Sequence, residues 1–107
     1  MSQPLHNVAI LFADISGSTR LYEQLGDAQA RDILGRAIEF LSARIGEFEG
    51  RVVKTIGDEV MAVFPDADRA LQAACAMQRG LSSPMVAQAF KPAFIKIRVG
   101  FHAGPVI

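Results

Sequence analysis

The spacing of apolar and polar residues along this chain predicts an alternation of strands and helices. An almost unbroken apolar run from Val8 to Ala13 is typical of a strand buried on both faces. Further strands are predicted over Arg51–Ile56 and Val60–Phe64, and a clearly alternating one over Phe94–Phe101. The Gly57-Asp58 dipeptide has strong turn chemistry, so the second and third strands are expected to form a hairpin.

Two helices are predicted between the first strand and this hairpin. The shorter one is expected to end at Leu25, because Gly26 follows it. Asp27 is expected to cap a longer helix that closes at Gly50. Apolar residues recur in this longer helix in steps of three and four, at Leu34, Ala37, Ile38, Leu41, Ile45 and Phe48.

A third helix is predicted after the hairpin, with Asp66 as its cap. Its residues at helical spacing are Ala70, Leu71, Ala74, Met77, Gln78 and Leu81. The segment from Ser82 to Pro92 is predicted to be a loop.

The order of these elements predicts the fold class. Two βαβ-like units joined by a hairpin are typical of the ferredoxin-like α+β sandwich, βαββαβ. We therefore expect an antiparallel sheet with the first and third strands in the middle and the helices on one face, as right-handed crossovers favour. The 107 residues contain no repeat or linker and are expected to form one domain.

Composition narrows the classes of function. Lys and Arg total 11, and Asp and Glu also total 11. The chain therefore lacks the excess of basic residues that is typical of proteins that bind nucleic acid. The one cysteine, Cys75, excludes an internal disulfide and fits a reducing compartment, and its alanine-rich surroundings predict a buried side chain. No apolar run is long enough to span a bilayer, so we expect a cytoplasmic segment without membrane contact, although a larger parent protein could be tethered.

Two carboxylates are candidates for a metal site. Asp14 ends the first strand and Asp58 lies in the turn before the third, and the ends of antiparallel neighbours meet. Paired carboxylates are costly without a cation, and their oxygens suit Mg²⁺. Two such cations can clamp both oxygens of a phosphoryl transfer. Alternatively, Asp14 is only a helix cap and Asp58 only a turn residue.

The segment from Ile15 to Thr19 is a candidate for binding phosphate. It joins a strand to a helix start, where backbone N–H groups attract anions, and Gly17 permits close approach of a ligand. The alternative is a serine-rich helix cap. Lys54, in the second strand, either donates to a nucleotide or simply extends to the edge of the sheet.

Three motifs resemble those of class III adenylate and guanylate cyclases. Phe12–Thr19 (FADISGST) is similar to the first metal motif of that family, Lys54–Glu59 (KTIGDE) to the second, and Arg98–Val106 (RVGFHAGPV) to the strand that follows. The motifs occur in the expected order and spacing, and the resemblance covers nearly the whole chain.

The resemblance implies a site and an activity. Two divalent cations, Mg²⁺ or Mn²⁺, would be held by Asp14, Asp58 and the backbone carbonyl of Ile15. The triphosphate would be bound by Gly17, Ser18 and Thr19. Lys54 occupies the adenine-reading position, where guanylate cyclases usually have glutamate, and this favours ATP over GTP because adenine N1 accepts a hydrogen bond. The 3′-hydroxyl of ATP would attack the α-phosphorus, giving 3′,5′-cyclic AMP and pyrophosphate.

The resemblance also implies that parts of the domain lie beyond Ile107. In the family, a second adenine-reading residue, a ribose-orienting asparagine and a transition-state arginine lie downstream and act across a dimer interface. We therefore expect a truncated catalytic domain, inactive alone and homodimeric in the full-length protein. Arg98 is expected to be structural, and so is His102. The alternatives are a guanylate cyclase, a catalytically silent signalling or dimerisation module, and another phosphoryl-transfer enzyme on the same core.

Overall fold

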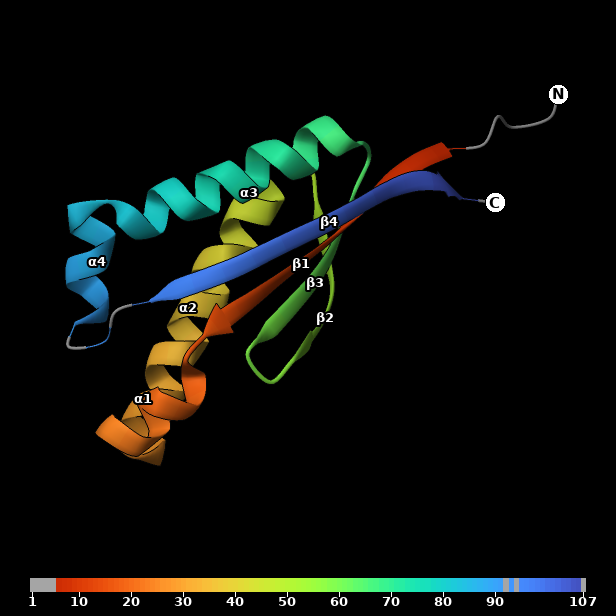
Figure 1. Ribbon diagram of the computed structural model, residues 1–107. Helices are drawn as coiled ribbons and strands as arrows, with labels where there is room; N and C mark the ends of the chain where they lie inside the picture. The colour runs from red at the N-terminus through yellow and green to blue at the C-terminus, as the bar shows by residue number, and fades with distance from the viewer. Residues whose placement is uncertain (1–5, 92, 94, 107) are drawn as a thin grey trace, which may run out of the picture.

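The computed structural model describes residues 6–91, 93 and 95–106, and the side chains of residues 8–91, 93 and 95–104. Strands and helices alternate along it as the sequence predicts (Figure 1). The elements are β1 (His6–Ser16), α1 (Ser18–Leu25), α2 (Asp27–Glu47), β2 (Arg51–Ile56), β3 (Glu59–Phe64), α3 (Ala67–Ser82), α4 (Pro84–Phe90) and β4 (Lys96–Val106).

The four strands form one antiparallel sheet in the order β2-β3-β1-β4. β1 lies in the middle, paired with β3 on one side and with β4 along its whole length on the other. The predicted α+β class and the central position of the first and third strands are therefore confirmed. β4 extends further than predicted, to Val106, and the predicted first residue of that strand, Phe94, lies outside the described residues.

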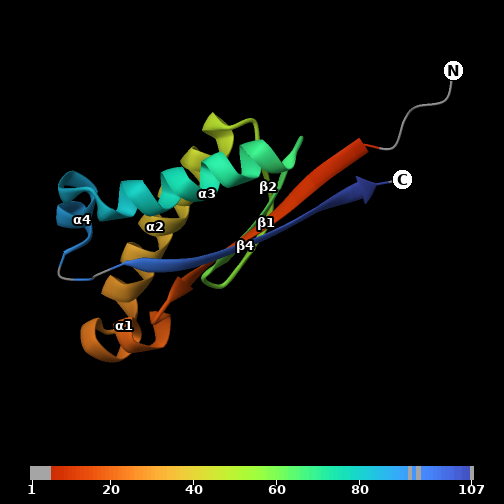
Figure 2. The ribbon, with the colours of Figure 1, turned by 45° about the horizontal axis from the view of Figure 1, so that its top comes forward.

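The core lies between the sheet and α2 and α3, which share one side of it (Figure 2). Side chains in a strand alternate between faces, and Ala9, Leu11, Ala13 and Ile15 of β1 are buried against the helices. The opposite face has no helix over it in the described part of the chain, and Phe12 is 41% exposed there. From α2, the same core takes Ala30, Ile33, Leu34, Ala37, Leu41 and Ile45.

The helix boundaries differ from the predictions at three places, one of which is the end of α2, at Glu47 with Phe48 as its C-cap rather than at Gly50. α2 begins at Asp27 with Gly26 as its N-cap, so Asp27 is not the cap but an acidic residue in the first turn, where the helix dipole favours it. The predicted loop after Ser82 contains α4 instead. Ser83 accepts a hydrogen bond from the Val86 N–H and Pro84 occupies the first turn, which are ordinary signals of a helix start.

Two side chains of α3 were predicted on the wrong side of the helix. Cys75 is exposed rather than buried, and Leu71 is 51% exposed. The buried stripe of α3 consists of Ala70, Ala73, Met77 and Leu81. Small residues on both flanks of this helix make its apolar face ambiguous in the sequence, and packing against the sheet decides its rotation. His102, which was expected to pack within its strand, is also exposed, because β4 is an edge strand.

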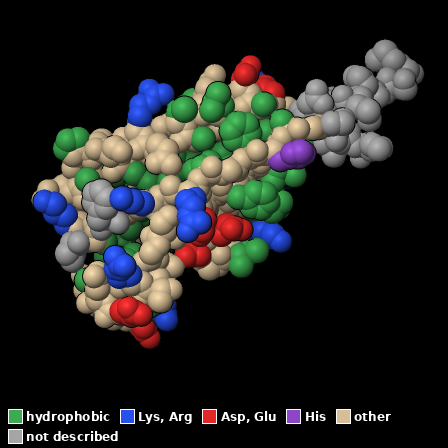
Figure 3. All heavy atoms as spheres, in the orientation of Figure 1, with side chains coloured by type: hydrophobic (Ala, Val, Ile, Leu, Met, Phe, Trp, Pro, Cys, Tyr) green, Lys and Arg blue, Asp and Glu red, His purple; other side chains and the backbone are tan. Residues whose placement is uncertain are grey.

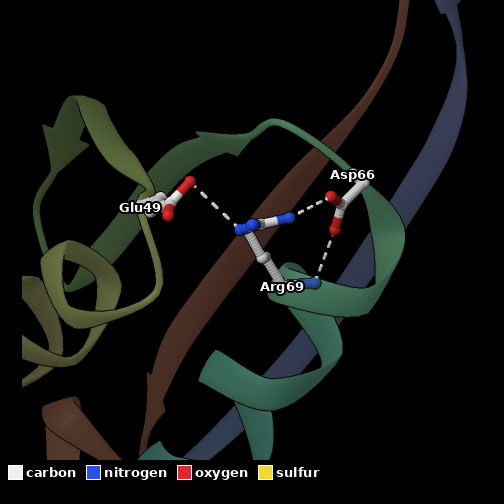
Figure 4. A network of polar contacts seen from close by, with 3 residues as sticks. All are labelled: Glu49, Asp66 and Arg69. Atoms are coloured by element: carbon white, nitrogen blue, oxygen red, sulfur yellow. Dashed lines mark hydrogen bonds and ion pairs between the residues drawn. The ribbon is translucent and has the colours of Figure 1, made fainter.

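The link between α2 and β2 is tied to the start of α3 by a polar network (Figure 4). Arg69 Nε lies 3.1 Å from Glu49 Oε2, and the guanidinium also contacts the Asp66 carboxylate. Asp66 caps α3 as predicted, accepting the Arg69 backbone N–H at 2.8 Å. This network holds the end of the sheet opposite the β2–β3 turn.

Candidate active site

Asp14 lies near the end of β1, half-buried, between two charged neighbours. Its partner in β3 is Glu59 and its partner in β4 is Arg98. Directly opposed residues of a sheet project from the same face, so these three side chains form a row on the helix-free face. Figure 3 shows acidic side chains gathered toward the lower end of the sheet with a basic side chain against them.

Asp58 lies in the β2–β3 turn and is joined twice to the segment that follows Asp14. Its carbonyl oxygen accepts the Ile15 N–H at 3.0 Å. Its carboxylate oxygen Oδ2 accepts the Ser18 hydroxyl at 2.5 Å. The turn and the β1–α1 junction are thus one unit, although 40 positions separate Ser18 from Asp58.

The β1–α1 junction is open to solvent. Gly17 is the N-cap of α1 with φ of 76°, and no heavy atom lies within 4 Å of the place where a Cβ would stand. Its carbonyl accepts the Leu21 N–H at 3.2 Å, which leaves the first N–H groups of the helix without partners inside the helix. These donors suit an anion.

Two hollows flank the start of α1. The larger, of about 740 Å³, has Ser16, Gly17 and Thr19 in its lining, together with the charged residues Arg20, Glu23 and Lys96. The smaller, of about 400 Å³, includes Ser18, Tyr22, Arg31, Gly57 and Asp58 in its lining. Ser18 and Thr19 therefore line different hollows, although they are neighbours in the chain.

Lys54 is exposed on the same sheet face as Asp14. A register irregularity between Val52 and Lys54 pairs Lys54, rather than Val53, with Met61 of β3. Met61 pairs in turn with Phe12 of β1, one side-chain position along the strand face from Asp14. Lys54 therefore lies on the Asp14 face, two strands from β1 and level with Phe12 rather than with Asp14. The bulge causes this, because without it Val53 would occupy that position.

The donor set fits a hard divalent cation. Two carboxylates and the backbone oxygens beside them are the ligands that Mg²⁺ accepts, with further positions left for phosphate oxygens and water. Among the described residues no group of three or more His, Cys, Asp or Glu side chains gathers as a metal site. Asp14 lies on the helix-free face, whereas Asp58 shares the smaller hollow with residues of α2, and among the described contacts none joins the two carboxylates directly.

Glu59 and Arg98 are the neighbours of Asp14 that the sequence analysis did not assign to the site. Arg98 was expected to be structural, yet it stands in the same row as Asp14. The alternation of side chains along the strands could have predicted these two neighbours. A two-residue turn at 57–58 makes Glu59 the first residue of β3, and the antiparallel pairing of β3 with β1 then sets it opposite Asp14.

Comparison with known proteins decides the family. The family model for the adenylate and guanylate cyclase catalytic domain matches residues 1–107. The chain belongs to this family. Nucleotide cyclases are phosphorus–oxygen lyases, and the resemblance of the three motifs is thereby confirmed at the level of the family.

Relatives of this cyclase domain include two adenylate cyclases. That of Anabaena cylindrica is 32% identical over 108 residues, covering 94% of this chain and 21% of that protein. The terminal-differentiation-specific adenylate cyclase of Dictyostelium discoideum is 31% identical over 107 residues, covering 94% of this chain and 5% of that protein. The cyclase domain thus spans 21% and 5% of the length of these two relatives.

Solved cyclase structures share the fold of this cyclase domain. The adenylyl cyclase CyaB from P. aeruginosa superimposes with a TM-score of 0.82 at 24% identity, over 98% of this chain and 59% of that one. The guanylate cyclase domain of RhGC from Catenaria anguillulae gives 0.79 at 24% identity, over 99% of this chain and 60% of that one. No helix in the described part of the cyclase domain combines the length and apolar character needed to cross a membrane.

Proposed function

We propose that this cyclase domain takes part in converting ATP to 3′,5′-cyclic AMP and pyrophosphate. One observation carries the proposal. The turn that bears Asp58 is bonded through Ile15 and Ser18 to the junction that follows Asp14, so an acidic residue lies against the segment where α1 begins. Carboxylates and phosphate-binding donors at one place are what metal-assisted phosphoryl transfer requires.

Asp14, Asp58 and the Ile15 carbonyl are proposed to hold the two divalent cations, Mg²⁺ or Mn²⁺. Bound there, the cations supply the positive charge that lowers the pKa of the attacking 3′-hydroxyl and offsets the charge of the triphosphate. Asp14 presents its carboxylate on the open sheet face, where a substrate has access. The short backbone link between Ile15 and Asp58 keeps the two donors from separating.

Gly17, Ser18 and Thr19 are proposed to receive the triphosphate through their backbone N–H groups. The dipole of α1 adds partial positive charge at this end of the helix. Arg20 and Lys96 in the lining of the larger hollow add two cations in reach of an anionic ligand. The chain's own contribution is therefore positioning and charge stabilisation, which is the usual balance in phosphoryl transfer.

Lys54 is proposed to read adenine. An ammonium group only donates hydrogen bonds, so it complements adenine N1 and not the N1–H of guanine. Its place on the Asp14 face supports this role, and so do the adenylate cyclases among the relatives. The fold alone does not separate the two substrates, because solved adenylyl and guanylate cyclases resemble it about equally.

A homodimer is proposed as the assembled state. The helix-free face exposes Phe12 of β1 by 41% and Ile56 of β2 by 57%. Apolar side chains of this size gathered on one sheet face are typical of an association surface. A second copy of the domain would cover them.

The test is a nucleotide assay with matched variants. Cyclic AMP formation from Mn²⁺–ATP, with GTP in parallel, is measured for the full-length protein, in which the homodimer is proposed, together with binding of Mn²⁺ by calorimetry. Asp14→Asn and Asp58→Asn are expected to lose Mn²⁺ binding and activity, whereas Asp68→Asn, an exposed change in the first turn of α3, keeps both. Mn²⁺ binding that persists undiminished in both active-site variants would rule the proposal out.

A further inference from the structure

The hydrogen bond from Ser18 to Asp58 has a function that phosphate binding does not cover. The Ser18 Oγ has one proton, and it points to Asp58 Oδ2 at 2.5 Å. A hydroxyl that donates to a carboxylate has no second proton to offer a phosphate. The contribution of Ser18 to anion binding then comes from its backbone, and its side chain acts on Asp58.

The hydrogen bond from Ser18 fixes the orientation of the Asp58 carboxylate, which the backbone bond does not. The bond from the Ile15 N–H holds the Asp58 main chain, but the carboxylate can still rotate about its own side-chain torsions. Donation from Ser18 to Oδ2 selects one orientation. The other carboxylate oxygen keeps its lone pairs for a cation.

We propose that Ser18 is a positioning residue that orients the Asp58 carboxylate for the divalent cation. The inference rests on the proposed function, since it presupposes that Asp58 is a metal ligand. Hydrogen bonds from neighbouring residues hold metal-ligating side chains in the productive orientation, and losing one weakens metal binding by about 10- to 100-fold. Ser18 thereby also links the occupancy of the metal site to the start of α1, where the triphosphate is expected.

The geometry distinguishes Ser18 from the other hydroxyls of the junction. Ser16 and Thr19 line the larger hollow, on the other side of the α1 start. Ser18 and Asp58 share the smaller one. Ser16→Ala therefore removes a hydroxyl from the same loop without touching Asp58, which makes it the matched control for binding of metal alone.

The experiment titrates Mn²⁺ into the chain without nucleotide, by calorimetry and by the loss of the free Mn²⁺ signal in electron paramagnetic resonance. Ser18→Ala is expected to weaken Mn²⁺ binding by about tenfold. Ser18→Thr, which retains the hydroxyl, and Ser16→Ala are expected to bind as the parent does. Ser18→Cys keeps the size of the side chain but donates weakly, so it repeats the test should alanine disturb the fold.

The outcomes separate this inference from the proposed function. If Asp58→Asn loses Mn²⁺ while Ser18→Ala and Ser18→Cys bind it as tightly as the parent or more tightly, the positioning role is wrong and the metal site stands. If Asp58→Asn itself binds Mn²⁺ normally, the metal site is wrong and the positioning role with it. Weak binding in Ser18→Ala and Ser18→Cys, restored in Ser18→Thr, supports the inference, because a purely structural role of the serine would not follow the hydroxyl.

Discussion

Asp14 of β1 and Arg98 of β4 are direct partners in the sheet, so a carboxylate and a guanidinium project from the same face at the same level. The arginine thereby adds a positive charge to a row that also contains the carboxylates of Asp14 and Glu59. A guanidinium is also well shaped for phosphate, because its N–H groups can bind two oxygens at once.

Replacing Arg98 by glutamine is expected to weaken binding of the nucleotide more than binding of the metal. The affinity for Mn²⁺–ATP should fall several-fold, whereas the affinity for Mn²⁺ alone should stay the same or rise, since a positive neighbour of Asp14 is removed. Both are measured by calorimetry. Arg79→Gln, an exposed change in the last turn of α3, serves as the control. Equal loss of both affinities would contradict the role given to Arg98.

Lys54→Glu is expected to reverse the base preference. A carboxylate accepts the hydrogen bond that guanine N1–H donates and repels the acceptor N1 of adenine. The ratio of ATP to GTP affinity should fall by about tenfold or more, which corresponds to a hydrogen-bond change of roughly 1.5 kcal/mol. Lys91→Glu makes the same charge change at the C-cap of α4, and its ratio should not move. An unchanged ratio in Lys54→Glu would mean that another residue reads the base.

Asp66 is expected to make the stability depend on pH in the acid range. The hydrogen bond from the Arg69 N–H, with the Arg69 guanidinium beside it, lowers the pKa of this carboxyl from its ordinary value of 3.8. A lowered folded-state pKa contributes stability that is present above the ordinary value and is lost as the pH falls through the folded value. Thermal unfolding of Asp66→Asn, which keeps a capping side chain, should show a lower Tm than the parent at pH 7.

The gap in Tm between the parent and Asp66→Asn should close as the pH is lowered through the depressed pKa of Asp66, below its ordinary value of 3.8, because the parent carboxyl is then protonated as well. Circular dichroism melts across this range measure it. A gap of constant size at every pH would show that the charge of Asp66 is not what the substitution removes.

Two helical glycines should respond to alanine in opposite directions. At Gly35 of α2 an added Cβ meets no heavy atom within 4 Å, so Gly35→Ala is expected to stabilise the fold by about 0.5–1 kcal/mol. At Gly80 of α3 a Cβ would stand 2.4 Å from Cζ of the Phe40 ring, which belongs to α2. Gly80→Ala is therefore expected to have the lower Tm of the two variants. If both variants gained equally, α2 and α3 would not be in close contact at this point.

Much of the fold could be predicted because its signals are local. The apolar run before Asp14, the turn at Gly57 and the helical period of α2 each depend on a few neighbouring residues. α4 carried comparable signals at Ser83 and Pro84, but in seven residues they are too short to stand out from a loop. The exposure of Leu71 and Cys75 could not be predicted, because an alanine-rich helix with small residues on both flanks has no single apolar face.

The features of the candidate site can also be divided into those that the sequence predicts and those that depend on the fold. The sequence by itself determined that one acidic residue lies near the end of the first strand and another in the turn before the third, although β1 continues past Asp14 to Ser16. It also determined that a glycine-containing loop follows Asp14, and that the motifs are those of the cyclase family. Spacing and turn chemistry are properties of the covalent chain and do not depend on packing.

Only the tertiary structure decided which groups face one another across the site. The row of Glu59, Asp14 and Arg98, the bulge that sets Lys54 on the same face, and the bond from Ser18 to Asp58 all join residues far apart in the chain. A shift of one residue in strand register would turn a strand side chain such as that of Asp14 or Lys54 to the other face. Register is set by burial of the core against α2 and α3, which is a property of the folded chain as a whole.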